Sequence, residues 1–335
     1  MLKRISVLEQ SVAVNGRPQA TSIQDAVELA RLCEMLGYHR FWVSEHHSHP
    51  SIVGSAPEIL MGAIASVTNK IRIGSAGVML PHYSALKVAE QFRVLDALAP
   101  GRIDLGVGRA PGSDYRTAQL LNPDPRSSER FPEQIRDLDL WLSNTEFPPD
   151  HPARGIHAFP QSDSRPDLWV LGSSDYGAQV AAHFGLPYAF AHFITDGRGA
   201  KEALDLYRAR FQPSVHLNEP EPVVCVWALV AHTEEEARYQ FQSRALWKID
   251  RNRGDLGSLI PPEIASSRNL SIGEKVQLDE LQKNAIVGNP QQVKVQLEVL
   301  AQHLNVQEIV VITWAHDFNI RKESYRLLAE VMDLI

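Results

Sequence analysis

The sequence has few of the features that mark secreted, membrane-spanning and disulfide-stabilised proteins. Among its 335 residues only Cys33 and Cys225 are cysteines, one in a predicted helix and the other in a predicted strand. Two isolated cysteines form no disulfide framework, so we expect buried packing residues in a reducing cytoplasm, not catalytic thiols. The longest apolar run, 223–231, is too short to span a bilayer. Glu9 interrupts the apolar start, which indicates a first strand and not a signal peptide.

Basic clusters and nucleotide fingerprints are also missing. The formal net charge is −7 and no dense run of Lys and Arg occurs, so we expect no nucleic-acid or membrane partner. No G-x-G-x-x-G motif follows the first predicted strand, which disfavours an open dinucleotide-binding sheet. The content of 44% hydrophobic and 22% charged residues is typical of globular proteins. With no internal repeat or low-complexity linker, the sequence predicts a single domain over 1–335.

Short apolar runs alternate with amphipathic segments along the whole chain. The predicted strands are 5–8, 41–44, 71–78, 103–107, 168–171, 188–191, 223–231 and 308–312. Helices are predicted at 22–35 (capped by Ser22), 57–67, 85–98, 130–142, 175–184, 199–211, 234–247, 290–304 and 320–332. Eight strand–helix units predict an α/β fold, the (β/α)8 or TIM barrel.

Two segments interrupt this rhythm and are predicted as insertions. The first, about 147–165, comes after the fourth strand and its helix, and its composition is compatible with a small hairpin. The second, about 249–284, comes after the seventh strand and its helix and is compatible with partial helix. Insertions at the strand ends of a barrel commonly wall its active site.

Three titratable side chains, Glu45-His46-His47, follow directly after the second predicted strand. Neighbouring side chains on a strand point to opposite faces, so His46 should face one way and its two neighbours the other. We therefore expect His46 in a pocket, and Glu45 and His47 bracing the wall behind it. The competing interpretation is a pair of histidines held by hydrogen bonds at the barrel rim.

Donors suited to an anion follow other strands. Gly172-Ser173-Ser174 opens a helix, where free N–H groups and hydroxyls form either an anion site or a simple N-cap. Arg109 lies in a glycine-flanked loop and either binds a phosphate or pairs with Asp104 or Asp114. Together these residues indicate a phosphate-bearing ligand, and the small or apolar residues around them suit a flat aromatic cofactor.

A metal site and a serine nucleophile are the alternatives to such a ligand. The possible metal ligands are Glu45, His47, His49, His82 and His192. The pair His46-His47 is split across two faces and no acidic cluster accompanies the histidines, so we expect no metal. Ser173 and Ser174 lack the G-x-S-x-G context of a nucleophile.

Several stretches resemble the bacterial luciferase-like flavin monooxygenases. They are Ser-Glu-His-His at 44–47, Ile-Gly-Ser-Ala-Gly-Val-Met-Leu-Pro at 73–81, Ala-Glu-Gln-Phe at 89–92, Gly-Arg-Ile-Asp-Leu-Gly-Val-Gly-Arg at 101–109 and Val-Gly-Asn-Pro at 287–290. The resemblance covers nearly the whole chain except the two insertions. It is strongest to an uncharacterised luciferase-like branch that carries Gly-Arg-Ala-Pro-Gly-Ser-Asp, here 108–114.

The resemblance implies a TIM barrel that acts as a homodimer through the helix containing Glu90. It implies FMN as cofactor, supplied in reduced form by a separate flavin reductase, and the use of oxygen to oxidise a small organic substrate such as an aldehyde. By position, His46 matches the histidine that the family needs beside the flavin, and Ala76 and Gly77 match a cis peptide packed against the flavin ring. Arg109 and Ser173 match phosphate contacts.

Two departures from the luciferase pattern bear on the expected activity. Gly172 and Tyr176 stand where the luciferase has a glutamate and a threonine in the phosphate loop, although the Tyr176 hydroxyl can still donate to a phosphate. Gly108 replaces the cysteine that precedes the family's arginine. Light emission is therefore not implied, and the substrate stays open.

The leading hypothesis is thus an FMN-dependent two-component monooxygenase in the cytoplasm. In it His46, with a pKa expected near the working pH, serves as hydrogen-bond partner or acid/base. The alternatives are a flavin-binding protein without turnover and a deazaflavin-dependent dehydrogenase of the same superfamily.

Overall fold

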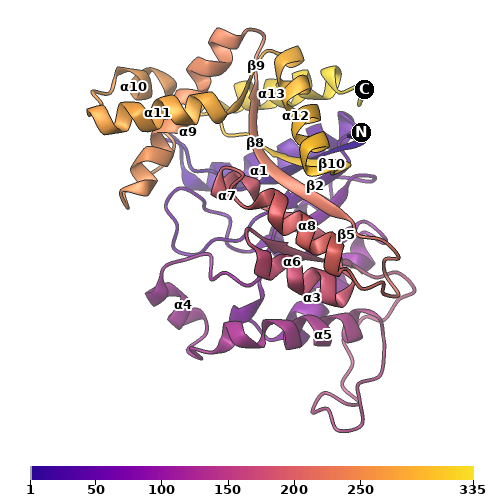
Figure 1. Cartoon of the computed structure of the whole chain (residues 1–335). Helices are drawn as coiled ribbons and strands as arrows, with labels where there is room; N and C mark the ends of the chain where they lie inside the picture. Colours follow the sequence, from indigo (N-terminus) through magenta and orange to yellow (C-terminus); the bar gives the residue numbers. More distant parts are fainter. Residues whose placement is uncertain (1) are drawn as a thin grey trace.

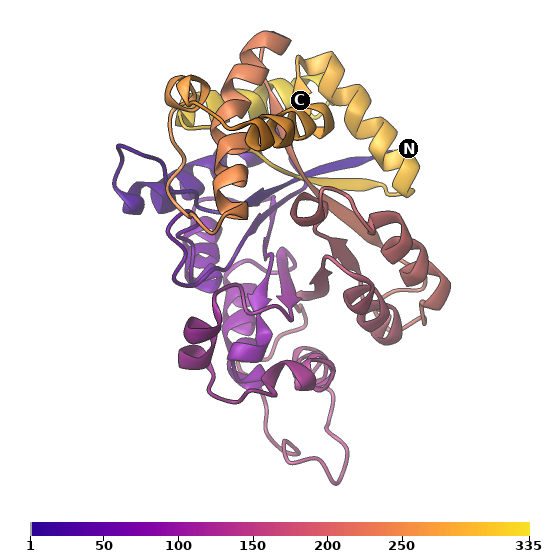
Figure 2. The ribbon, with the colours of Figure 1, turned by 60° about the vertical axis from the view of Figure 1, so that its left-hand side comes forward.

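The computed structural model, which describes residues 2–335, confirms the predicted TIM barrel. The barrel strands are β1 (Arg4–Glu9), β2 (Arg40–Val43), β3 (Arg72–Ser75), β5 (Ile103–Gly108), β6 (Asp167–Gly172), β7 (Tyr188–Phe190), β8 (Pro222–Val230) and β10 (Glu308–Ile312). All of them pair in parallel, and β10 closes the ring by pairing with both β1 and β8. Figure 2 shows the strands at the centre and the helices around them.

An outer layer of helices covers the barrel (Figure 1). Its members are α1 (Gln19–Met35), α2 (Pro57–Ala65), α3 (Ala85–Leu98), α5 (Phe131–Leu142), α6 (Asp175–Phe184), α8 (Ala200–Arg210), α9 (Glu234–Asn252), α12 (Pro290–Leu304) and α13 (Phe318–Val331). One apolar cluster lies between strands and helices, and a second fills the barrel interior around Trp42 and Trp169. Among the described residues, no helix has the length and apolar character needed to cross a membrane.

The structure corrects the predicted start of one helix and the predicted extent of one strand. Helix α1 begins at Gln19, after Pro18, so Ser22 lies within the helix and is not its cap. The Ser22 hydroxyl donates to the Val12 carbonyl at 2.8 Å, outside the helix. The strand expected at 71–78 is split, because β3 ends at Ser75, a cis peptide joins Ala76 to Gly77, and β4 (Val78–Met79) follows and pairs with β5.

The insertions also differ in detail from the prediction. Within the described chain the segment 147–165 contains no strand, so the expected hairpin is wrong; it extends as a loop at the bottom of Figure 1. The segment 249–284 contains the end of α9, then α10 (Pro262–Ser267) and α11 (Ile272–Asn284), and leads into β9 (Ile286–Gly288). A helix missed by the prediction, α4 (Tyr115–Leu121), is capped by the Asp114 carboxylate.

Charged side chains fill the barrel interior at the N-terminal ends of the strands. The Arg40 guanidinium donates to Glu308 at 2.9 Å and to Asp104 at 3.0 Å, and it lies 4.6 Å from the Trp169 ring centroid. Asp104 also accepts from the Trp42 indole at 2.8 Å and from Arg72. Although burial opposes it, the Arg40 and Arg72 guanidiniums lower the pKa of Asp104, so this carboxylate is paired as an ion.

A glycine in β3 makes room for this arrangement. A Cβ atom on Gly74 would lie 2.5 Å from the Trp42 indole and 2.7 Å from the Asp104 Cβ. Gly74 is aligned with Trp42 on β2 and with Asp104 on β5. The indole and the carboxylate can therefore meet across β3 only because that strand carries no side chain there.

Arg40→Met should lower the free energy of unfolding by about 3–5 kcal/mol, because Asp104 and Glu308 would stay buried without their shared cation. Urea unfolding followed by circular dichroism measures this loss. The matched control is Arg130→Met, since Arg130 pairs with Asp124 on the surface at 58% exposure, and its effect should stay within about 0.5 kcal/mol. Equal effects of the two substitutions would contradict the structural role assigned to Arg40.

Candidate active site

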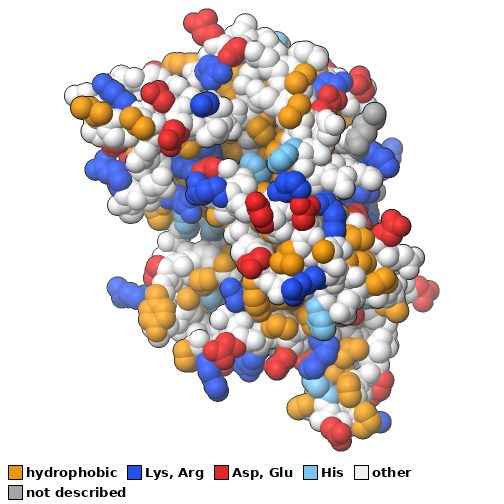
Figure 3. Space-filling view, in the orientation of Figure 1, with side chains coloured by type: hydrophobic (Ala, Val, Ile, Leu, Met, Phe, Trp, Pro, Cys, Tyr) orange, Lys and Arg blue, Asp and Glu red, His pale blue; other side chains and the backbone are white. Residues whose placement is uncertain are grey.

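A cavity of about 670 Å³ opens at the C-terminal ends of the barrel strands. Figure 3 shows the molecule hollowed between the part that carries α9–α11 and the part that carries α4 and α5. The structure brings every predicted site residue to the lining of this one cavity: His46, Ala76, Gly77, Arg109, Gly172, Ser173, Ser174 and Tyr176. The C-terminal strand ends are where TIM barrels carry their active sites.

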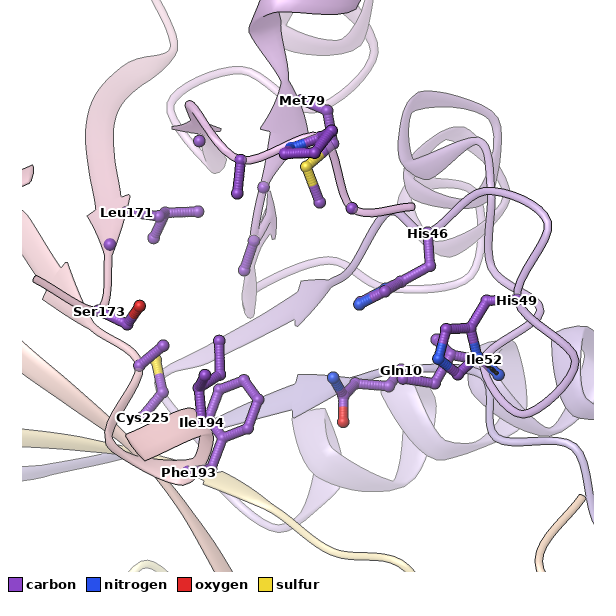
Figure 4. Close-up of a pocket in the computed structure, with 18 of the residues that line it drawn as sticks. Gln10, His46, His49, Ile52, Met79, Leu171, Ser173, Phe193, Ile194 and Cys225 are labelled. Atoms are coloured by element: carbon purple, nitrogen blue, oxygen red, sulfur yellow. Dashed lines mark hydrogen bonds between the residues drawn. The ribbon is translucent and has the colours of Figure 1, made fainter. Parts of the chain in front are cut away.

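His46 points into the cavity beside Gln10, across from Ser173 (Figure 4). Its backbone N–H donates to the Gly54 carbonyl at 2.9 Å, and its ring Nδ1 lies 3.4 Å from the Ser44 hydroxyl. Burial, and then the nearby His49 ring, lower the pKa of His46 to about 4. The expectation of a pKa near the working pH is therefore wrong: His46 is neutral at pH 7, with one ring nitrogen as donor and the other as acceptor.

Glu45 braces the wall behind His46, as predicted. Its buried carboxylate accepts from the Tyr83 hydroxyl at 2.7 Å and from the Met79 backbone N–H at 3.1 Å, and it lies 2.6 Å from the His47 Nε2. Burial and the bond to Glu45 raise the pKa of Tyr83, so this hydroxyl stays a donor. Glu45 thus ties the end of β2 to β4, although the His47 ring also reaches the cavity lining.

The anion donors lie at another part of the cavity lining. Within residues 2–335 the Arg109 guanidinium and the Ser173 and Ser174 hydroxyls make no hydrogen bond to the protein. The Arg109 guanidinium carbon lies 3.8 Å from the Tyr176 ring centroid, a cation–π contact. The predicted alternative, a clamp to Asp104 or Asp114, is wrong, because Asp104 bonds Arg40, Arg72 and Trp42 while Asp114 caps α4. Ser174 occupies the N-cap position of α6 without a side-chain capping bond.

A flat apolar strip lies next to these donors. It consists of Ala76, Gly77, Met79 and Leu171, and the peptide between Ala76 and Gly77 is cis, as the resemblance implied. A Cβ atom on Gly77 would lie 2.2 Å from the Leu171 Cδ1 and 2.8 Å from the Gly106 carbonyl oxygen, so the strip is packed from behind. An apolar strip that leads to free N–H, hydroxyl and guanidinium donors fits an aromatic ring with a phosphate tail.

Sequence reasoning missed several lining residues. Gln10 directly follows β1, so the rule that strand ends carry site residues would have found it. Helix α9 contributes Arg244, Lys248 and Arg251, whose spacing of four and three residues marks one helix face. His192, which follows β7 and was named as a possible metal ligand, lines a neighbouring cavity instead.

The possible metal ligands are not assembled into a site. No group of three or more His, Cys, Asp or Glu side chains within residues 2–335 is arranged to hold a metal ion. The Glu45 carboxylate is occupied by three hydrogen-bond partners, and the His82 Nε2 lies 2.8 Å from the Pro111 carbonyl oxygen. These two groups therefore already have partners within the protein.

NMR titration of the histidine ring protons tests the neutral state of His46. The chain has 13 histidines, and His46→Gln identifies the resonance by its loss. That resonance should keep its neutral shift from pH 8 down to about pH 5. Because the unfolded chain binds this proton near pH 6.5 and the folded chain only near 4, acidification through this window should also lower the free energy of unfolding. A titration midpoint above pH 6 would contradict the burial effect.

Comparisons with known proteins agree with this geometry. The family model described as luciferase-like monooxygenase matches residues 5–307. The uncharacterised protein YceB of Bacillus subtilis (strain 168) is 41% identical over 329 residues, and the N-acetyl-S-alkylcysteine monooxygenase of the same strain is 36% identical over 331 residues; each alignment covers 98% of both chains. The crystal structure of apo-MsnO8 matches with a TM-score of 0.90 at 38% identity, over 100% of this chain and 99% of that one. The chain therefore belongs to the luciferase-like monooxygenase family and is an oxidoreductase.

Proposed function

We propose that this protein is an FMN-dependent monooxygenase that receives reduced FMN from a separate flavin reductase and oxidises a small organic substrate in the cytoplasm. The observation that carries the proposal is the free donor set of Arg109, Ser173 and Ser174, which lines the same cavity as the neutral His46 and the apolar strip. The missing dinucleotide fingerprint supports an external source of electrons.

The residues of the chain divide the work of such a reaction. Reduced FMN, when bound, supplies two electrons to molecular oxygen, so that one oxygen atom enters the substrate and the other leaves as water. Arg109 and the hydroxyls of Ser173 and Ser174 hold the phosphate, with Tyr176 beneath the guanidinium. Ala76, Gly77 and Leu171 support the ring and exclude water from it.

His46 holds a proton at the reacting face. A neutral imidazole donates from one nitrogen and accepts at the other, so it can hydrogen-bond the reacting oxygen and take up a proton without first losing one. The Ser44 hydroxyl, 3.4 Å from Nδ1, favours Nε2 as the nitrogen that meets the substrate side. Glu45 accepts from the Met79 backbone N–H and so links the chain next to His46 to β4.

The substrate and the assembly state are parts of the same proposal. The family resemblance suggests an aldehyde as substrate. One relative is named as an N-acetyl-S-alkylcysteine monooxygenase, so thioethers are a second substrate class to assay. We propose a homodimer through the face of α2 and the Glu90-bearing α3, which exposes three large apolar side chains: Ile59, Val94 and Leu98 at 72%, 49% and 64%.

His46→Gln should leave FMN affinity within about twofold but lower product yield by roughly 100-fold, the usual scale of lost acid–base assistance. Oxygen consumption, hydrogen peroxide release and product are measured together with supplied reduced FMN. The control is His232→Gln, which changes a histidine that is 67% exposed and should behave as the unmodified protein. Unchanged coupling of oxygen use to product in His46→Gln would reject the role.

Arg109→Gln should weaken FMN binding by about 10- to 100-fold, because one charge-assisted bond to the phosphate is lost. Riboflavin, which lacks the phosphate, should bind the variant as well as it binds the unmodified protein. Flavin fluorescence titration measures both ligands, and Arg116→Gln on the exposed face of α4 serves as control. An equal loss of riboflavin affinity would show that Arg109 does not contact the phosphate.

A parallel fluorescence titration with a deazaflavin tests the alternative cofactor.

A further inference from the structure

We propose that the cavity contains a second anion site, built around Arg244 on α9, which binds a carboxylate of the substrate. The apolar body of that substrate would lie against the tryptophan wall formed by Trp227, Trp247 and Trp314. This inference rests on the proposed function, because it assigns the substrate class of the same cavity: an apolar compound with an anionic group.

Arg244 is a buried cation without an acidic partner. Its side chain is 8% exposed, and it makes no hydrogen bond or ion pair with any residue in the described range 2–335. Its guanidinium carbon lies 4.6 Å from the Trp227 ring centroid. Burial lowers the pKa of Arg244 to about 10, so the group is still charged at neutral pH. A buried charge of this kind is expected to have a counter-ion, and here the cavity is where it would lie.

Two acidic side chains, Asp196 and Glu280, line the neighbouring cavity that Arg244 also borders, and within residues 2–335 neither forms an ion pair with Arg244. Asp196, whose charge raises the pKa of Arg244 against the effect of burial, forms an ion pair with Lys248 on α9. Asp114 is the acidic residue of the cavity lining, and its carboxylate caps α4. Arg251, two turns further along α9 than Arg244, adds a second positive charge to the lining. The lining of the main cavity therefore carries more positive than negative charge at α9, where a bound anion would be favoured.

This cation set differs from the proposed phosphate site. Arg109 follows β5 and lies against Tyr176 of α6, whereas Arg244 lies on α9, which packs against β8 and β9. In Figure 1, α6 and α9 lie in different parts of the molecule. One phosphate tail occupies one donor set, so the second set is available to a second anion.

The tryptophan wall indicates what is attached to that anion. Trp247 and Trp314 meet edge to face at 4.6 Å, and the Trp247 indole nitrogen donates to the Ser51 hydroxyl at 2.8 Å. All three tryptophans line the cavity together with Arg244. Aromatic faces beside one buried guanidinium suit an apolar chain or ring that ends in a carboxylate. An uncharged substrate would leave Arg244 without a counter-ion.

Calorimetric titration of the protein saturated with oxidised FMN tests the site without turnover. The probes are octanoate and octanamide, which share an apolar chain and differ in the charge of the head group. Octanoate should bind the unmodified protein at least tenfold more tightly than octanamide. Arg244→Gln should reduce this preference to less than twofold, and Arg244→Lys should keep most of it. The control is Arg238→Gln on the same helix, where Arg238 pairs with Glu234 at the surface.

Three results would overturn the proposal. They are the absence of an octanoate preference in the unmodified protein, a full preference in Arg244→Gln, and a loss of FMN affinity in Arg244→Gln as large as the loss of octanoate affinity. The last result would assign Arg244 to the cofactor phosphate. If Arg244→Gln does not fold, as judged by circular dichroism, the unmodified protein and Arg244→Lys still decide the outcome. Failure of FMN-dependent oxygenation would be a separate result, because ligand preference is measured without it.

Discussion

The ion pairs of Arg40 with Asp104 and Glu308 inside the barrel are the constraint on which the rest of the structure depends. These ion pairs lie in the barrel interior at the N-terminal ends of the strands. Trp42 and Trp169 pack against each other and against Arg40, and so separate the ion pairs from the cavity. Charged groups are buried here only because each is paired. Because the lower barrel is filled in this way, the cavity can form only at the C-terminal strand ends, where the loops supply chemistry.

Burial sets the chemistry of that cavity in two opposite ways. At His46 it removes the charge, and the neutral ring becomes a donor and acceptor that faces the cavity. At Arg244 burial lowers the pKa only to about 10, so the guanidinium stays protonated at neutral pH. A bound anion would stabilise this buried charge. The Arg109 guanidinium, which lies over Tyr176, forms a second anion site. We propose that a flavin phosphate binds at Arg109 and a substrate carboxylate at Arg244.

Much of the architecture was predictable from local sequence patterns. The alternation of apolar strands and amphipathic helices predicted the barrel, and residues directly after the strands, such as His46 and Ser173, do line the cavity. The failures were also local. Ser22 has the chemistry of a cap, but Pro18 starts the helix earlier, and the run 71–78 has the composition of one strand although its backbone breaks at 76–77.

The sequence by itself determined the fold class, the family resemblance and the set of strand-end residues, because strand and helix periods are short-range properties. Only the tertiary structure decided that His46 is neutral, that Glu45 ties β2 to Met79, and that Arg244 joins the cavity without a partner. Each of these depends on tertiary packing, which brings α9 to a mouth built from strand ends of both halves of the chain. Burial and pairing follow from that packing, and no local pattern contains them.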